Sequence, residues 1–110
     1  MIGYKQFSVN KDGRLTSILD GPHAYTYKMG VWNHPKKGCG PFGVHGTLED
    51  CVNYGRLSPD EELWRVEYEE SEEDHFYSTE EPYGYNVDEN TVFAAKLKLV
   101  EKIYDRENQP

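Results

Sequence analysis

The sequence predicts an α+β domain, a mainly antiparallel sheet of four to five strands with one principal helix, at about 47–55, packed on one face. Two patterns lead to this prediction. Short segments alternate apolar and polar residues with a period of two, as half-buried strands do. One further segment carries start and stop signals for a helix. Because aromatic residues make up 14 % of the chain, a folded domain is favoured over disorder.

The N-terminal part predicts a hairpin. Residues 2–9 alternate as a strand, Asn10–Gly13 forms a turn with Asp-Gly at its centre, and residues 15–18 continue as a short second strand. After a break at 20–22, residues 24–28 predict another short strand.

The middle of the chain predicts a loop followed by the helix. Residues 30–46 are rich in glycine and contain two prolines, which indicates irregular structure. Thr47 is a good N-cap, acidic residues follow it in the first turn, and Gly55 is a plausible stop. Leu48, Cys51 and Val52, with Tyr54, form the predicted inner stripe.

The C-terminal part predicts two paired strands. After a turn or helix start at 58–61, residues 63–69 alternate with Trp64, Val66 and Tyr68 on one face. Residues 92–100 alternate likewise, with Phe93, Ala95, Leu97 and Leu99 inward and two lysines outward. If the strands pair, Lys96 and Lys98 face Glu67 and Glu69. Residues 70–91 predict a long loop.

The length of 110 residues allows one domain, which we place at 1–105. We expect residues 106–110 to be a frayed tail. The start of the chain lacks the pattern of a signal peptide, and no apolar run is long enough to span a membrane. With only two cysteines, we expect free thiols and a cytoplasmic location.

Charge is distributed unevenly along the chain. The net charge is −8, but residues 60–90 alone carry thirteen carboxylates against Arg65, a net charge of −12. Binding to phosphate backbones needs a basic patch, so we expect no direct contact with nucleic acid.

Four potential metal ligands lie close together in the sequence. They are His34, Cys39, His45 and Cys51, in the spacing His-x4-Cys-x5-His-x5-Cys. Zinc sites use pairs of ligands two to four residues apart, and this spacing matches no common module. A thiolate paired with a histidine would be a nucleophile, but a cysteine on the inner stripe of a helix is inert. We therefore expect no metal and no cofactor.

The acidic segment also contains aromatic residues, which together suggest a docking surface. Tyrosine provides contact area at low entropic cost, while carboxylates attract a basic partner. We predict a protein-binding surface of nine residues: Glu69, Glu70, Glu72, Glu73, Asp74, Phe76, Tyr77, Tyr83 and Tyr85. Such a surface can also occupy a nucleic-acid groove of another protein, with carboxylates in place of phosphates.

Several short motifs resemble an uncharacterised family of small phage and bacterial domains. They are Gly3-Tyr4-Lys5-x-Phe7, Phe42-Gly43-Val44-His45, Asp50-Cys51-x-x-Tyr54, Leu63-Trp64-x-Val66-Glu67 and Ala94-Ala95-Lys96-Leu97-Lys98-Leu99, in this order over residues 3–100. This family has no assigned activity, so the resemblance implies a phage or mobile-element origin more than a function.

A second resemblance is to ADP-ribosyltransferases. Val44-His45-Gly46-Thr47 and the helix through Tyr54 are similar to two motifs of those enzymes. This resemblance implies an enzyme that uses His45 and a strand glutamate, Glu67 or Glu69. The leading hypothesis remains a small, non-enzymatic, phage-encoded protein that docks on a basic host or phage protein, as an inhibitor of nucleic-acid handling or defence. The alternatives are the transferase and a structural or regulatory phage component.

Overall fold

The structure, a computed structural model, describes residues 1–18, 24–78 and 88–110. Five strands form the main sheet: β1 (Ile2–Val9), β2 (Leu15–Thr16), β4 (Phe42–His45), β5 (Glu61–Glu70) and β7 (Thr91–Asp105). One helix, α1 (Leu48–Tyr54), connects β4 to β5, and two short strands, β3 (Cys39–Gly40) and β6 (Tyr77–Ser78), pair separately. The predicted α+β class is confirmed.

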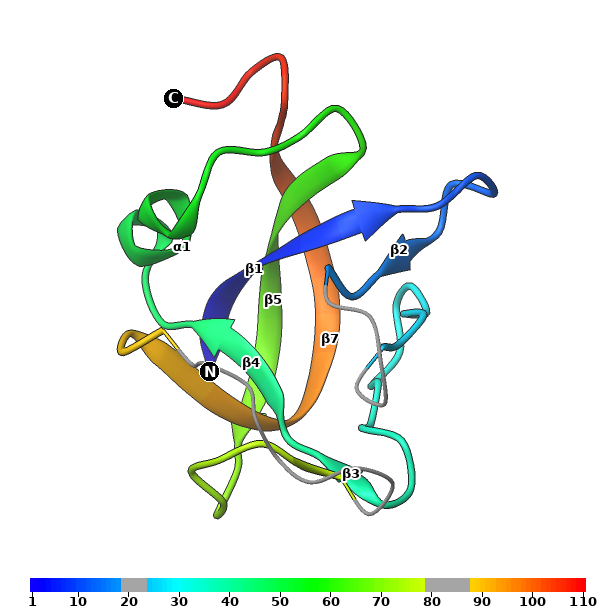
Figure 1. Ribbon diagram of the computed structural model, residues 1–110, viewed down its shortest axis with the longest axis vertical. Helices are drawn as coiled ribbons and strands as arrows, with labels where there is room; N and C mark the ends of the chain where they lie inside the picture. The colour runs from blue at the N-terminus through cyan, green and yellow to red at the C-terminus, as the bar shows by residue number, and fades with distance from the viewer. Residues whose placement is uncertain (19–23, 79–87) are drawn as a thin grey trace.

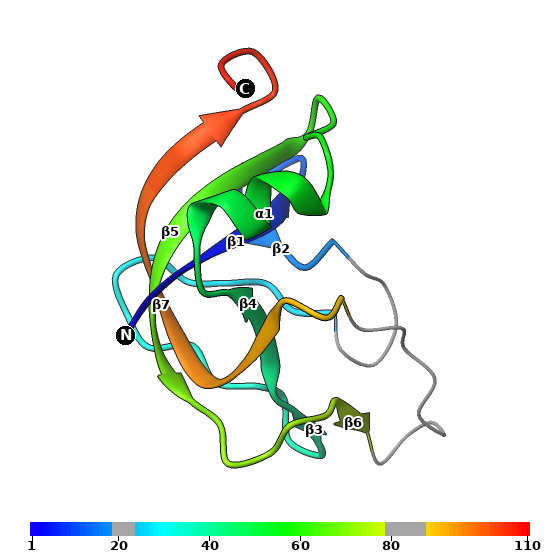
Figure 2. The same cartoon turned by 90° about the vertical axis from the view of Figure 1, so that its left-hand side faces the viewer.

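The main sheet closes on itself. Its strand order is β2-β1-β4-β7-β5, and β5 pairs in turn with β1. The strands β1, β4, β7 and β5 therefore form a closed barrel around a core (Figures 1 and 2). Every pairing is antiparallel. Closure was not predicted, and it removes most of the unpaired strand edge that an open sheet would expose.

The N-terminal hairpin forms as predicted, with a shorter second strand. β2 pairs through Thr16 and Leu15 with the end of β1. Gly13 adopts φ 80°, a conformation that favours glycine in the turn. The strand predicted at 24–28 is reduced to a single bridge between Thr16 and Thr26.

The prediction of a loop over 30–46 is wrong for β3 and β4. Phe42–His45 is a central strand between β1 and β7, and its side chains Phe42 and Val44 are buried. The strand is only four residues long and contains Gly43, so its alternation is too short to recognise in the sequence.

The predicted helix is confirmed with its caps. Thr47 accepts a hydrogen bond through Oγ1 from the amide of Asp50 at 3.1 Å, and Gly55 is the C-cap. Cys51 is fully buried, Leu48 and Val52 pack beside it, and Tyr54 is 51 % exposed. The helix lies against the outer side of β1 and β5 (Figure 2).

The predicted pairing of β5 with β7 is confirmed, with Glu67 opposite Lys98 and Glu69 opposite Lys96. One detail differs. The register shifts between Glu69 and Glu70, where the next partner is Ala94, so Ala95 is an extra residue in β7. The shift reverses the alternation: Ala94 is buried and Ala95, predicted inward, is exposed.

The core has two parts. Inside the barrel lie Phe7, Leu15, Tyr27, Phe42, Val44, Val66, Tyr68, Ala94, Leu97 and Leu99. A smaller cluster under α1 contains Cys51, Leu57 and Leu63. The tail that we expected to fray folds back onto this cluster, because the Gln109 amide bonds both the N–H and the C=O of Leu57, at 2.7 and 3.1 Å.

Candidate functional site

Most of the carboxylates along β5 are matched by the protein's own bases. Lys96 lies 3.4 Å from Glu69, Lys102 lies 3.8 Å from Glu62, and Arg65 is ion-paired with Glu101. Glu67 stands opposite Lys98 in the ladder. This part of the acidic segment therefore has little net charge to attract a basic partner.

The acidic residues from the last position of β5 onward differ. Glu70, Glu72, Glu73 and Asp74 are exposed. In the part of the chain that the structure describes, they have no ion pair with a lysine or an arginine. Oδ1 of Asp74 lies 3.3 Å from Nδ1 of His75. We call these four residues the acidic end of β5.

The backbone of this segment is held in place. The amide of Ser71 donates to the carbonyl oxygen of Phe93 at 2.8 Å, and the Ser71 hydroxyl accepts from the amide of Glu73 at 3.0 Å. The backbone that carries the carboxylates on either side of Ser71 is thus fixed at one end of the barrel.

The predicted aromatic anchors do not all belong to this surface. Phe76 is half-buried, packs edge-on against Phe93 at 5.0 Å, and lies directly over Gly43. Tyr77 contributes its backbone to β6, pairing with Gly40. Tyr83 and Tyr85 lie outside the described residues.

Two exposed apolar side chains lie beside the acidic end instead. Met1 is 65 % exposed and Ile2 49 %. The backbone of Met1 exchanges two hydrogen bonds with Tyr68, and Ile2 stands opposite Glu67. Both residues therefore lie next to the C-terminal end of β5. Sequence reasoning missed them because position in the chain does not show which strand end they reach.

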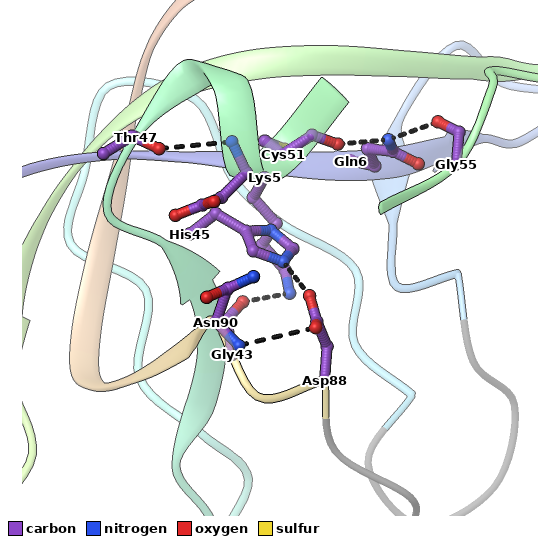
Figure 3. Close-up of polar contacts among 10 residues, drawn as sticks. Lys5, Gln6, Gly43, His45, Thr47, Cys51, Gly55, Asp88 and Asn90 are labelled. Carbon is purple, nitrogen blue, oxygen red and sulfur yellow. Dashed lines mark hydrogen bonds and ion pairs between the residues drawn. The ribbon is translucent and has the colours of Figure 1, made fainter. Parts of the chain in front are cut away.

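His45 forms a polar contact with Asp88. It lies on β4, is 7 % exposed, and its Nε2 is 2.9 Å from Oδ2 of Asp88 (Figure 3). The hydrogen bond from His45 holds the pKa of Asp88 below its usual range, with further help from the amides of Asn90 and Glu89. The Tyr54 ring is 5.2 Å away on the helix side.

Next to His45, the side chain of Lys5 links β1 to β4 where the backbone pairing of these two strands ends. β1 and β4 share a single pair, Tyr4 with His45, and beyond it Lys5 donates through Nζ to the carbonyl oxygen of Gly43 at 2.5 Å (Figure 3). Burial lowers the pKa of Lys5 to about 8, although the nearby Cys51 acts in the other direction. Burial likewise raises the pKa of Cys51 to about 12, against the effect of Lys5.

The residues considered for catalysis or metal binding lie in separate places. His45 is on β4 and Glu67 and Glu69 are on β5, and β1 runs between these two strands. Cys51 is buried under the helix, while His34 is exposed in a loop. Among residues 1–18, 24–78 and 88–110, no three histidine, cysteine or carboxylate side chains gather as metal ligands would.

Among the described residues, no helix has the length and apolar character needed to cross a membrane. Comparison of the chain with protein-family models, with curated proteins and with solved structures gives no match.

Proposed function

We propose that this protein is a non-enzymatic binding protein that docks on a basic protein through the acidic end of β5. The observation that carries the proposal is a contrast between carboxylates that face bases of the same chain and carboxylates that do not. Carboxylates from Glu62 to Glu69 face bases of the same chain, whereas Glu70, Glu72, Glu73 and Asp74 are exposed without a lysine or arginine partner among the described residues.

Crowding four carboxylates costs free energy through like-charge repulsion, which a cationic partner would relieve. Met1 supplies exposed apolar area beside the charges, and apolar contact surrounded by charge is typical of protein interfaces. The sharpest form of the proposal is a partner whose own ligand is a nucleic acid, because a basic groove accepts carboxylates in place of phosphates.

The test is affinity capture at low salt from a lysate of the bacterium in which a phage-encoded protein of this kind would act, followed by purification of the captured protein and measurement of its dissociation constant. Glu70→Lys, Glu72→Lys and Glu73→Lys together should weaken binding by ~100-fold or more, and binding should weaken as salt rises.

The matched control is Asp12→Lys, Glu49→Lys and Glu107→Lys, which makes the same change in net charge at exposed positions elsewhere. If both triple variants lose affinity equally, net charge decides binding and the acidic end has no special role. An interaction that salt does not affect would reject the proposal.

For the transferase alternative, the geometry offers no supporting observation. His45 is nearly enclosed and its Nε2 is engaged by Asp88. Incubation with labelled NAD and candidate acceptors checks this alternative directly: transfer that disappears in His45→Ala would establish it over the docking proposal.

A further inference from the structure

Six large apolar side chains are exposed in the part of the chain that the structure describes. Among the described residues they are Met1 (65 % exposed), Ile2 (49 %), Met29 (55 %), Val31 (47 %), Tyr54 (51 %) and Val100 (44 %). Tyr54 lies on α1. Of the others, Ile2 stands next to β5 in the register, with Met1 before it, Val100 lies on β7, and Met29 and Val31 lie in the turn that is bridged to β7.

The register places four segments side by side, β1, β5, β7 and the turn of residues 28–33, which we call columns. Ile2 on β1 stands opposite Glu67 on β5, which stands opposite Lys98 on β7. The Nζ of Lys98 lies 4.8 Å from the centre of the Trp32 ring, so the turn of residues 28–33 forms the fourth column. This turn is bridged to β7 through Asn33 and Leu97, and Figure 2 shows it, in cyan, beside β7.

The fourth column is fixed rather than loose. The buried Asn33 side chain bonds the N–H and C=O of Lys28 and the carbonyl oxygens of Val31 and Leu97. The Nζ of Lys96 also lies over the Trp32 ring, at 4.5 Å. The backbone that carries Met29 and Val31 is therefore held in position, which lowers the backbone entropy that a contact would cost.

The charges of this face balance. Its bases are Arg65, Lys96 and Lys98, and its acids are Glu67, Glu69 and Glu101. The face is thus neutral on a chain of net charge −8. Two copies of so acidic a chain repel each other over most of their surfaces, but not here.

We propose that the outer face of β5 and β7 is an interface at which a second copy of this chain docks with two-fold symmetry. A two-fold axis parallel to the strands and between them lays the acids of β5 over the bases of β7 in the other copy. The same axis lays Ile2 over the Val31–Trp32 column of the other copy. The face is therefore complementary to itself in both charge and apolar contact, as an isologous interface requires.

The first test is sedimentation equilibrium over a range of protein concentrations. The wild-type chain should form a dimer, and Ile2→Glu with Val31→Glu should raise its dissociation constant by ~100-fold. Asn53→Glu with Tyr54→Glu is the matched control, because it adds the same two charges at exposed positions of α1; it should leave the dimer unchanged. A wild-type chain that is monomeric at millimolar concentration, or a dimer weakened equally by the control, would overturn the proposal.

The second test exchanges charges. Glu67→Lys and Lys98→Glu each place like charges against each other across the two-fold axis, so each variant alone should dimerise poorly. An equimolar mixture of the two should form a mixed dimer, because every contact between the copies is then of opposite sign. Thermal unfolding at a concentration where all variants are monomeric separates this effect from damage to the fold. If both variants fold well and the mixture stays monomeric, this face is not the interface.

Discussion

Asn33 is a buried polar residue whose side chain satisfies four backbone groups of the 28–33 turn and of β7. Replacing it with alanine removes the side-chain partner of the N–H and C=O of Lys28 and of the C=O of Val31, whereas the Leu97 carbonyl oxygen keeps the backbone N–H of Asn33 at 2.7 Å. Each such loss costs about 1–3 kcal/mol. We expect Asn33→Ala to lower the free energy of unfolding by about 3 kcal/mol in chemical denaturation. Asn53→Ala, at an exposed helix position, should change it by less than about 0.5 kcal/mol. Equal effects of the two changes would contradict the role assigned to Asn33.

Lys5 gives a second prediction at the residue scale, a pH dependence. Burial lowers its pKa from 10.5 to about 8, so the folded protein releases this proton before the unfolded chain does. The free energy of unfolding should therefore rise as pH increases from 8 towards 10.5, and the stabilisation is lost as pH falls through 8. At ~1.4 kcal/mol per pKa unit, and with partial exposure of the side chain, we expect a gain of about 1–2 kcal/mol.

The measurement compares Cys51→Ala with the double variant Lys5→Met, Cys51→Ala at pH 7.5 and pH 10. The common background is needed because burial raises the pKa of Cys51 to about 12, and its titration acts in the opposite direction as pH rises through 9 to 12. The difference in unfolding free energy between the two proteins should change by the stated amount. If this difference is the same at both pH values, folding does not lower the pKa of Lys5.

At the scale of elements, Gly43 decides how β4 packs under the Phe76 ring. A Cβ there would lie 2.9 Å from Cζ of Phe76 and 3.3 Å from Cγ2 of Thr91. We expect Gly43→Ala to displace the ring from Phe93 and to destabilise the protein by about 1–3 kcal/mol. Gly46→Ala is the control, because the nearest atom to its Cβ is 3.7 Å away, an ordinary contact. Amide exchange should increase in β3 and β6 for the first variant only; an unchanged exchange pattern would mean that Phe76 moves without loosening them.

Elements with local signals were predicted, and those that depend on distant partners were not. Thr47 and Gly55 delimit the helix because capping is a matter of a few neighbouring residues. The Glu67–Lys98 pairing followed from alternation in two long strands. β4 was missed because four residues with a central glycine carry no clear period, and its place is set by β1 and β7. Likewise, nothing local indicates that His45 contacts Asp88, 43 residues later.

At the scale of the whole molecule, the sequence showed where the charge lies along the chain but not which carboxylates are already neutralised. That distinction depends on the register of β5 against β7, which matches Glu69 and leaves Glu70 beyond the last ion pair. The apolar part of the candidate site was not predictable for the same reason. Closure of the barrel brings Met1 and Ile2 to the end of β5, whereas the sequence pointed to Phe76, whose ring is used in the fold.

The net charge of the molecule provides a prediction that needs no partner. If the acidic end of β5 is not neutralised within the chain, its repulsion destabilises the folded state, and salt should relieve it. Raising the ionic strength from 0.01 to 0.5 M shortens the screening length from about 30 Å to a few ångströms. We expect the melting temperature of the wild-type chain, followed by circular dichroism, to rise by about 4–8 °C, corresponding to about 1 kcal/mol. Glu70→Lys, Glu72→Lys and Glu73→Lys together should remove most of this rise, whereas Asp12→Lys, Glu49→Lys and Glu107→Lys, with the same net charge, should retain most of it. Equal salt responses of the two triple variants would mean that repulsion is spread over the whole surface, and the reason for a cationic partner at this end of the barrel would disappear.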